Sequence, residues 1–110
     1  MKLPDIAFTT ADWGRAPRTE HPGARGISFW RTIEAAGLRT RLVEYSAGFE
    51  SDHWCPRGHV MCVLEGDVTL RLKDGREHRL TAGQGFLAGD DESNPHLAVS
   101  ERGARVFLVD

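Results

Sequence analysis

One stretch of the chain reads Asp52-His53-Trp54-Cys55-Pro56-Arg57-Gly58-His59, and the apolar run 60–64 follows it before Glu65-Gly66. Three good metal-binding side chains, those of His53, Cys55 and His59, fall within seven residues. In an extended strand, two residues separated by one position point to the same face, so His53 and Cys55 are expected to project together. A helix would need such ligands three or four positions apart, and Pro56 and Gly58 disfavour a helix. The stretch therefore predicts two strands joined by a tight loop, with the ligands converging on one inner face.

The length and composition predict one globular domain. The chain has 110 residues, enough for a single core but not for two. It is 40% hydrophobic and 27% charged, which is ordinary for a globular protein. Its 12 glycines fall between short apolar runs, and this favours many strands and turns over a few long helices.

Charge and hydropathy argue against several classes of partner. The net charge is −2, whereas binding to nucleic acid or to an acidic membrane needs a concentrated basic surface. No apolar run approaches the length of a membrane span, and the N-terminus has no basic-then-apolar signal peptide. Two cysteines do not make a disulfide framework, and Cys62 is expected to pack in the core as a small apolar residue. We therefore expect a cytoplasmic protein with no nucleic-acid or membrane partner.

The rest of the chain divides into an irregular arm and a run of strands. Residues 1–26 mix turn residues with isolated apolar ones, and this arm is expected to pack on the barrel or on a neighbouring subunit, with Phe8 and Trp13 as anchors. Alternating or β-branched segments then predict strands, and Asp74-Gly75 is the strongest hairpin signal. Outside the opening stretch, the predicted strands are 27–33, 38–46, 67–73, 76–80, 86–88, 95–99 and 104–109. The chain is thus predicted to be all-β, with an antiparallel β-barrel or jelly roll over 27–110.

The opening stretch resembles the first motif of the cupin superfamily. Cupins are small β-barrels whose first motif supplies two histidines and a carboxylate, and whose second motif supplies a further histidine. The match runs from residue 48 to 66, with His53 at the first histidine, Cys55 at the second and His59 at the glutamate. The resemblance implies a single-domain cupin-type β-barrel with a metal site at its inner face.

The second cupin motif and a narrower group are also matched. Residues 83–88 and Pro95-His96 match the second motif loosely, which implies His96 as a fourth ligand. The order Asp52-His53-Trp54-Cys55 is similar to the small cupin-fold group labelled by its DHCW motif. The first motif is one residue shorter than usual before His53, and the segment 88–96 lacks the proline and glycine that typically precede the second-motif histidine. The narrow group implies a fold and a metal site but no settled reaction, so the catalytic residues are unknown.

The resemblance therefore implies a metal site made of His53, Cys55, His59 and His96. Three imidazoles and one thiolate supply one negative charge, as the usual three-histidine, one-glutamate set does. Such a set favours one divalent transition metal ion, namely zinc, iron, nickel or copper, over magnesium or calcium. A closed tetrahedron would indicate structural zinc, whereas a higher coordination number would leave room for water or substrate. A barrel with a polar interior and no metal is the alternative for the first three residues.

Two classes of function follow. One is a metalloenzyme of oxygenase or isomerase type that acts on a small organic molecule in the barrel. The alternative is a non-catalytic metal- or ligand-binding module whose metal is structural or sensory. Strand parity makes four residues candidates to orient a ligand, namely Arg41, Tyr45, Met61 and Arg71. Apolar residues on both strand faces also predict a homodimer, with residues 107–109 and Phe29-Trp30 as candidate interface elements.

Overall fold

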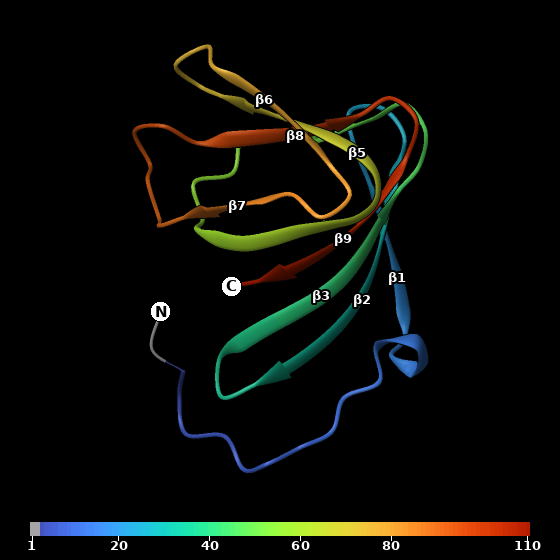
Figure 1. The fold of residues 1–110 in the computed structure, drawn as a ribbon, viewed down its shortest axis with the longest axis vertical. Helices are drawn as coiled ribbons and strands as arrows, with labels where there is room; N and C mark the ends of the chain where they lie inside the picture. The colour runs from blue at the N-terminus through green and yellow to red at the C-terminus, as the bar shows by residue number, and fades with distance from the viewer. Residues whose placement is uncertain (1–2) are drawn as a thin grey trace.

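The strands of the molecule curl into an antiparallel barrel of jelly-roll type (Figure 1). The structure is a computed structural model that describes residues 3–110. Within these residues the elements in chain order are η1 (Trp13–Arg15, a 3-10 helix), β1 (Arg18–Pro22), β2 (Ile27–Ala35), β3 (Leu38–Tyr45), β4 (Phe49–Glu50), β5 (His59–Leu72), β6 (Glu77–Thr81), β7 (Gly85–Ala88), β8 (His96–Ser100) and β9 (Ala104–Val109). All strand pairings between them are antiparallel. No helix in this part of the chain is long and apolar enough to cross a membrane.

The long strand β5 joins the two sides of the barrel. Along the main path the strands follow the order β1-β2-β3-β9-β5-β8-β4, and β6 and β7 also pair with β5. The first half of β5 pairs with β7 and β9, and its second half pairs with β6 and β8. A register shift between Val63 and Glu65 and a positive φ of 78° at Gly66 mark the point where the strand bends. The sequence pattern predicted two strands separated at Gly66, whereas the structure continues through this glycine as one bent strand.

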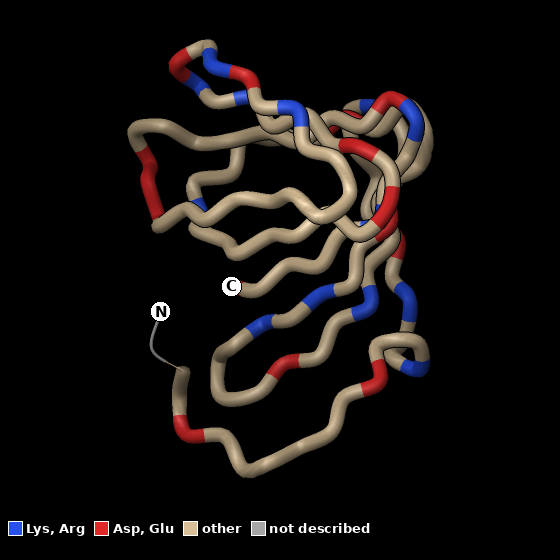
Figure 2. Tube along the Cα trace, viewed as in Figure 1, with Lys and Arg blue, Asp and Glu red and all other residues tan. Residues whose placement is uncertain are grey.

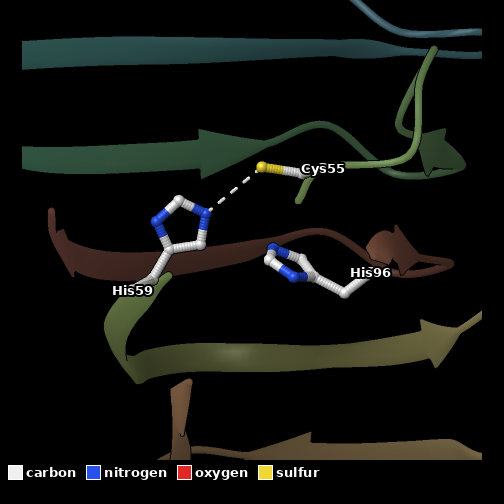
Figure 3. A group of neighbouring side chains, drawn as sticks. All are labelled: Cys55, His59 and His96. Carbon is white, nitrogen blue, oxygen red and sulfur yellow. Dashed lines mark hydrogen bonds between the residues drawn. The ribbon is translucent and has the colours of Figure 1, made fainter. Parts of the chain in front are cut away.

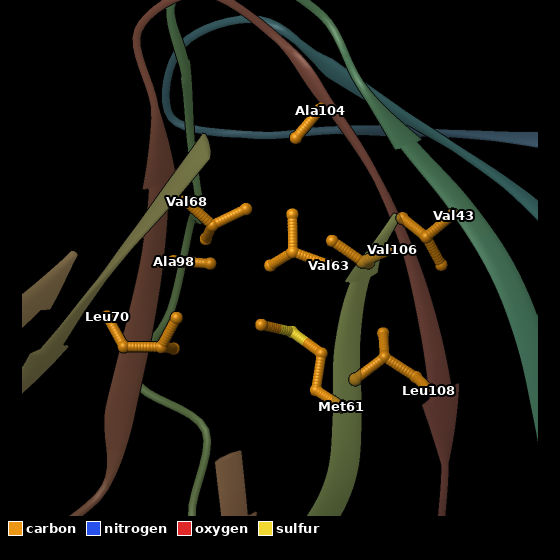
Figure 4. Packing of buried hydrophobic residues seen from close by; sticks show 9 residues of the cluster. All are labelled: Val43, Met61, Val63, Val68, Leu70, Ala98, Ala104, Val106 and Leu108. Atoms are coloured by element: carbon orange, nitrogen blue, oxygen red, sulfur yellow. The ribbon is translucent and has the colours of Figure 1, made fainter. Parts of the chain in front are cut away.

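The apolar core lies where the two sides of the barrel face each other (Figure 4). Side chains from β5 and β8 on one side meet side chains from β3, β5 and β9 on the other. The nine buried members are Val43, Met61, Val63, Val68, Leu70, Ala98, Ala104, Val106 and Leu108. Burial alternates along the first half of β5, where His59, Met61 and Val63 point inward. The same alternation places Cys62 outward, so the expectation that Cys62 packs in the core is wrong: its side chain is exposed.

The strand pattern predicted from the sequence agrees with most of the barrel. Strands β2, β3 and β9 begin at or within one residue of the predicted positions, and the turn at Asp74-Gly75 joins β5 to β6. Gly75 has a φ of 97°, which glycine adopts without a steric penalty in a tight turn. Lys and Arg positions are interspersed with Asp and Glu positions along the trace (Figure 2). The prediction of an all-β antiparallel barrel is confirmed.

The N-terminal arm is more ordered than the irregular segment 1–26 predicted from the sequence. Its residues 18–22 form β1 on the edge of β2, and His21 there stacks on Trp30 with ring centroids 3.6 Å apart. Trp13 packs edge-on against Phe107 at 5.1 Å, and its Nε1 donates to Thr40 Oγ1 at 3.2 Å. Phe8, by contrast, is 96% exposed, so it does not anchor the arm in this chain.

Replacing Gly66 by alanine should destabilise the barrel more than the same change at Gly75. Both glycines have positive φ, so each alanine carries backbone strain of about 1 kcal/mol. Only at Gly66 would the new Cβ also collide with the backbone of Gly103 and Ala104, whereas nothing lies within 4 Å at Gly75. We expect Gly66→Ala to lower the free energy of unfolding by roughly 3 kcal/mol. Urea denaturation of both variants measures the difference, and equal losses would contradict the bend in β5.

Candidate functional site

Three of the predicted ligands, Cys55, His59 and His96, meet inside the barrel (Figure 3). One ligand atom from each side chain lies within 4.8 Å of the other two, and Cys55 Sγ is 3.6 Å from His59 Nε2. His59 is buried, and Cys55 and His96 are half-buried. His59 is the first residue of β5 and His96 the first of β8, so the ends of two strands supply two of the three groups.

Main-chain hydrogen bonds hold the cysteine in place. Cys55 and His96 form an isolated β-bridge, in which Cys55 N donates to His96 O at 2.7 Å and His96 N donates to Cys55 O at 2.9 Å. The loop that carries Cys55 is also tied to the loop after β7, because Gly58 N donates to Asp90 Oδ1 at 2.6 Å. A Cβ at Gly58 would collide with the backbone of residues 88–90, so this close approach requires glycine.

The structure does not bring His53 to this group. Residues 52–53 form a bend rather than a strand, so the same-face argument from strand parity fails for His53 and Cys55. The His53 side chain is 73% exposed, and its Nδ1 lies 2.6 Å from Asp52 Oδ1. Of the four predicted ligands, the structure therefore gathers three, and metal binding by these three stays a prediction.

Sequence reasoning missed the carboxylate of Asp110. Its Oδ2 lies 2.8 Å from His59 Nδ1, and both side chains are more than nine-tenths buried. Arg39 donates to both carboxylate oxygens at 2.8 Å, and Arg41 Nη2 donates to Oδ2 at 3.1 Å. The angle between His59 and Asp110 does not fit a hydrogen bond, so His59 Nδ1 has a close anion but no aligned acceptor among the described residues. No spacing signal marks Asp110, because the long-range pairing of β3 with β9 brings it there.

The protonation states suit metal binding. Burial lowers the pKa of His59 to about 4 despite the nearby Asp110 charge, and burial also lowers the pKa of His96. Both rings are therefore neutral at pH 7 and carry a free lone pair. Burial acts to raise the pKa of Asp110, but the hydrogen bonds from Arg39 and the charges of Arg41 and Arg39 outweigh it and lower the pKa to about 2. Asp110 is thus an anion behind His59 in the neutral pH range.

The three side chains line a cavity of about 710 Å³. Of the residues predicted to orient a ligand, Arg41, Tyr45 and Met61 line this cavity. Arg71 does not, because its Nη1 donates to Glu50 Oε1 at 3.2 Å. The cavity is lined by charged and aromatic groups of β2 and β3 and by an apolar wall, which is made of Met61, Leu70, Phe86, Ala98 and Leu108. A cavity of this size accommodates a small organic molecule.

Comparison with known proteins supports the architecture. No protein-family model matches the chain, and no curated protein matches its sequence. An RmlC-like cupin from Shewanella frigidimarina is 19% identical over 94% of this chain and 89% of that chain, with a TM-score of 0.73. A sugar phosphate isomerase of the cupin superfamily from Silicibacter pomeroyi is 20% identical over 92% and 74% of the two chains, with a TM-score of 0.71.

A third solved structure, the FeII form of HppE in complex with substrate, is 14% identical with a TM-score of 0.74, over 96% of this chain and 62% of that one. The chain has a cupin fold. At these identities the likeness shows the fold of this chain and not its reaction.

The metal-free protein should lose stability as the pH falls from about 6.5 towards 4. The pKa of His59 is lowered from 6.5 to about 4 on folding, so in this window the unfolded chain binds a proton that the folded chain does not. Stability therefore rises with pH through the window and is fully present above it. The loss of unfolding free energy at the acid end is on the order of 3 kcal/mol, and the lowered pKa of His96 adds to it.

Urea denaturation of the chelated protein at a series of pH values measures this effect. His78, which lies in β6 and is exposed, supplies the control, since His78→Gln should leave the profile unchanged. A flat profile of the wild-type protein across the window would contradict the buried neutral state of His59.

Proposed function

We propose that this cupin binds one divalent transition metal ion through Cys55, His59 and His96 and acts as a metalloenzyme on a small organic molecule in its cavity. The observation that carries the proposal is the meeting of these three ligand atoms within 4.8 Å at the wall of the 710 Å³ cavity. One thiol and two neutral imidazoles fit zinc, iron, nickel or copper better than magnesium or calcium. When bound, such an ion supplies Lewis-acid chemistry or, for iron, nickel or copper, redox chemistry.

The number of ligands favours an enzyme over a closed structural site. Structural zinc sites use four protein ligands, whereas catalytic sites keep a position open for water or substrate. The structure offers three ligands, and His53 lies outside the group. The isomerase and the FeII form of HppE share the fold, which supports chemistry of isomerase or oxygenase type and an iron-binding site as one option. A binding module with a structural or sensory metal is the second candidate, and it requires His53 to close the site.

The chain's own residues would position the metal ligands and exclude bulk water, rather than take part in the reaction themselves. The Asp110 carboxylate lies beside Nδ1 of His59, and Nε2 on the other side of the ring faces Cys55. The bridge to His96 fixes the cysteine main chain. The apolar wall around Met61 and Phe86 keeps bulk water from one side of the cavity. Because both cysteines are free and Cys55 would serve as a thiolate, we also propose a reducing, cytoplasmic environment. The order Asp52-His53-Trp54-Cys55 is the reason for which we propose membership of the DHCW group.

Removing a proposed ligand should remove the metal, and removing His53 should not. We expect about one metal ion per chain in the wild-type protein, and loss of affinity by at least about 10-fold in Cys55→Ser and His59→Ala. His53→Ala is the matched control, because its ring is exposed and outside the group. Elemental analysis after dialysis against a chelator, with circular dichroism to verify folding, measures both effects.

The same proteins, loaded with cobalt, separate the enzyme from the binding module. A five- or six-coordinate absorption spectrum that changes when azide is added would support an open site. A closed tetrahedral spectrum that opens in His53→Ala would instead establish the module. Unchanged metal content in both Cys55→Ser and His59→Ala would refute the site altogether.

We also propose that the chain forms a homodimer through the outer face of β5 and β7. Val60 pairs with Leu87 across the two strands, and both side chains point outward with Cys62. Leu87 is 82% exposed, and Val60 and Leu64 are more than one-third exposed, so this face is an apolar surface without a cover. Of the interface elements predicted from the sequence, Leu108 and Trp30 point into the barrel, and Phe107 and Phe29 contact Trp13 and Arg18 of the same chain.

Sedimentation equilibrium tests the dimer. The wild-type protein should sediment as a dimer at micromolar concentration, and Leu87→Asp should sediment as a monomer because a carboxylate would be buried without a partner. His78→Asp places the same charge on β6 and should leave the dimer intact. A monomeric wild-type protein would overturn the proposal.

A further inference from the structure

Arg41 is a buried cation that faces the cavity with part of its hydrogen-bonding capacity unused. The residue is 5% exposed and lines the 710 Å³ cavity. Its Nη2 donates to Asp110 Oδ2, and its guanidinium lies 4.4 Å from the centroid of the Trp30 ring. The Nε atom is buried and has no hydrogen-bond partner among the described residues. A buried charged donor without an acceptor is costly, and the Arg41 guanidinium, whose side chain is 6% exposed, lies at the cavity wall with unused donor capacity.

The charges around Arg41 leave one positive charge in excess at the inner end of the cavity. Arg39 and Arg41 supply two cations there, and Asp110 supplies one anion. Burial, together with the charges of Arg41 and Arg39, lowers the pKa of His21, and burial raises the pKa of Tyr45 to about 12. Both side chains are therefore neutral at pH 7.

The other charged residues of the cavity lie at its rim. They are Glu20, Asp52 and Arg57, and His53 lies beside them. All four are exposed, so water and salt screen them. The buried and half-buried charged groups Arg39, Arg41 and Asp110 thus sum to a net charge of +1, which matches a monoanion.

The position of Arg41 connects this charge to the candidate metal centre. Arg41 Nη2 and His59 Nδ1 lie 3.1 and 2.8 Å from the same oxygen of Asp110. A group bound at Arg41 is therefore close to His59, while the apolar wall offers contacts to the rest of the ligand.

We propose that Arg41 forms an anion subsite that binds the carboxylate of a small organic acid with an apolar body. The Arg41 guanidinium donates to the carboxylate in a charge-assisted hydrogen bond, and the apolar body packs against Met61, Phe86 and Leu108. As the substrate site of the metalloenzyme, this inference rests on the proposed function, but binding of the carboxylate itself does not require the metal.

Isothermal titration with a matched pair of probes tests the subsite in wild-type protein. Benzoate and benzamide have the same size and shape, but only benzoate carries a charge. In chelated, metal-free protein we expect benzoate to bind at least about 10-fold more tightly than benzamide, because a hydrogen bond between charged groups is replaced by a weaker one. Equal affinities, or no binding of benzoate, would overturn the subsite.

Two variants assign the preference to Arg41. Arg41→Met keeps the length of the side chain without its charge and should abolish the preference for benzoate. Arg105→Met removes an arginine that pairs with Glu65 on the surface and should keep the preference. Thermal unfolding verifies that Arg41→Met is folded. If this variant does not fold, the comparison of benzoate with benzamide in wild-type protein still tests the subsite. A preference that survives in folded Arg41→Met would contradict the proposal.

Metal dependence separates this inference from the proposed function. Benzoate binding in metal-free protein that never takes up metal would support the subsite and refute the metalloenzyme. Benzoate binding only in metal-loaded protein would refute the subsite and leave the metal centre standing.

Discussion

The arrangement of the site depends on the contacts of the buried Asp110 carboxylate with its charged and polar neighbours. This carboxylate accepts hydrogen bonds from two arginines of β3 and lies beside His59 at the start of β5. The main chains of Arg39 and Asp110 also exchange hydrogen bonds of 2.7 and 2.9 Å, so the sheet itself fixes where the carboxylate sits. Without this anion, two guanidinium groups would share the end of the cavity with no counter-charge, which is a costly arrangement away from water.

The distribution of polar groups separates a stabilising part of the barrel from a chemical part. Around Val63 and Val106 the interior is apolar and fully buried, and packing there supplies stability (Figure 4). At the other end, the chain buries Arg41 and His59 instead. Buried ionic groups stabilise a fold little, because desolvation offsets their attraction, and apolar residues of similar volume often serve as well. A cluster that is confined to the cavity wall is therefore better explained by ligand chemistry than by folding.

Much of the fold could be predicted from the sequence, because side-chain alternation and turn residues are local signals. The strands around Arg41 and Val106 and the hairpin at Asp74-Gly75 follow directly from them. The placement of His53 could not, since strand parity holds only in extended backbone and the chain bends at residues 52–53. The place of Asp110 beside His59 also could not be predicted from the sequence, because this contact depends on the register of three strands that are distant in sequence. Local patterns thus identify ligand types, whereas long-range register decides which of them meet.

The loop around Cys55 bears directly on whether the site has three ligands or four. His53 and Cys55 are two residues apart, and Trp54 between them lies 4.7 Å from the Lys73 ammonium group. His53 lies at the rim of the cavity, and its exposed ring would have to move inward to join the three side chains. Two main-chain hydrogen bonds join Cys55 to His96, so the backbone two residues after His53 is held in place. Because the Cys55–His96 bridge fixes the backbone beside His53, the candidate group keeps three members at the cavity wall unless the His53 side chain alone swings inward.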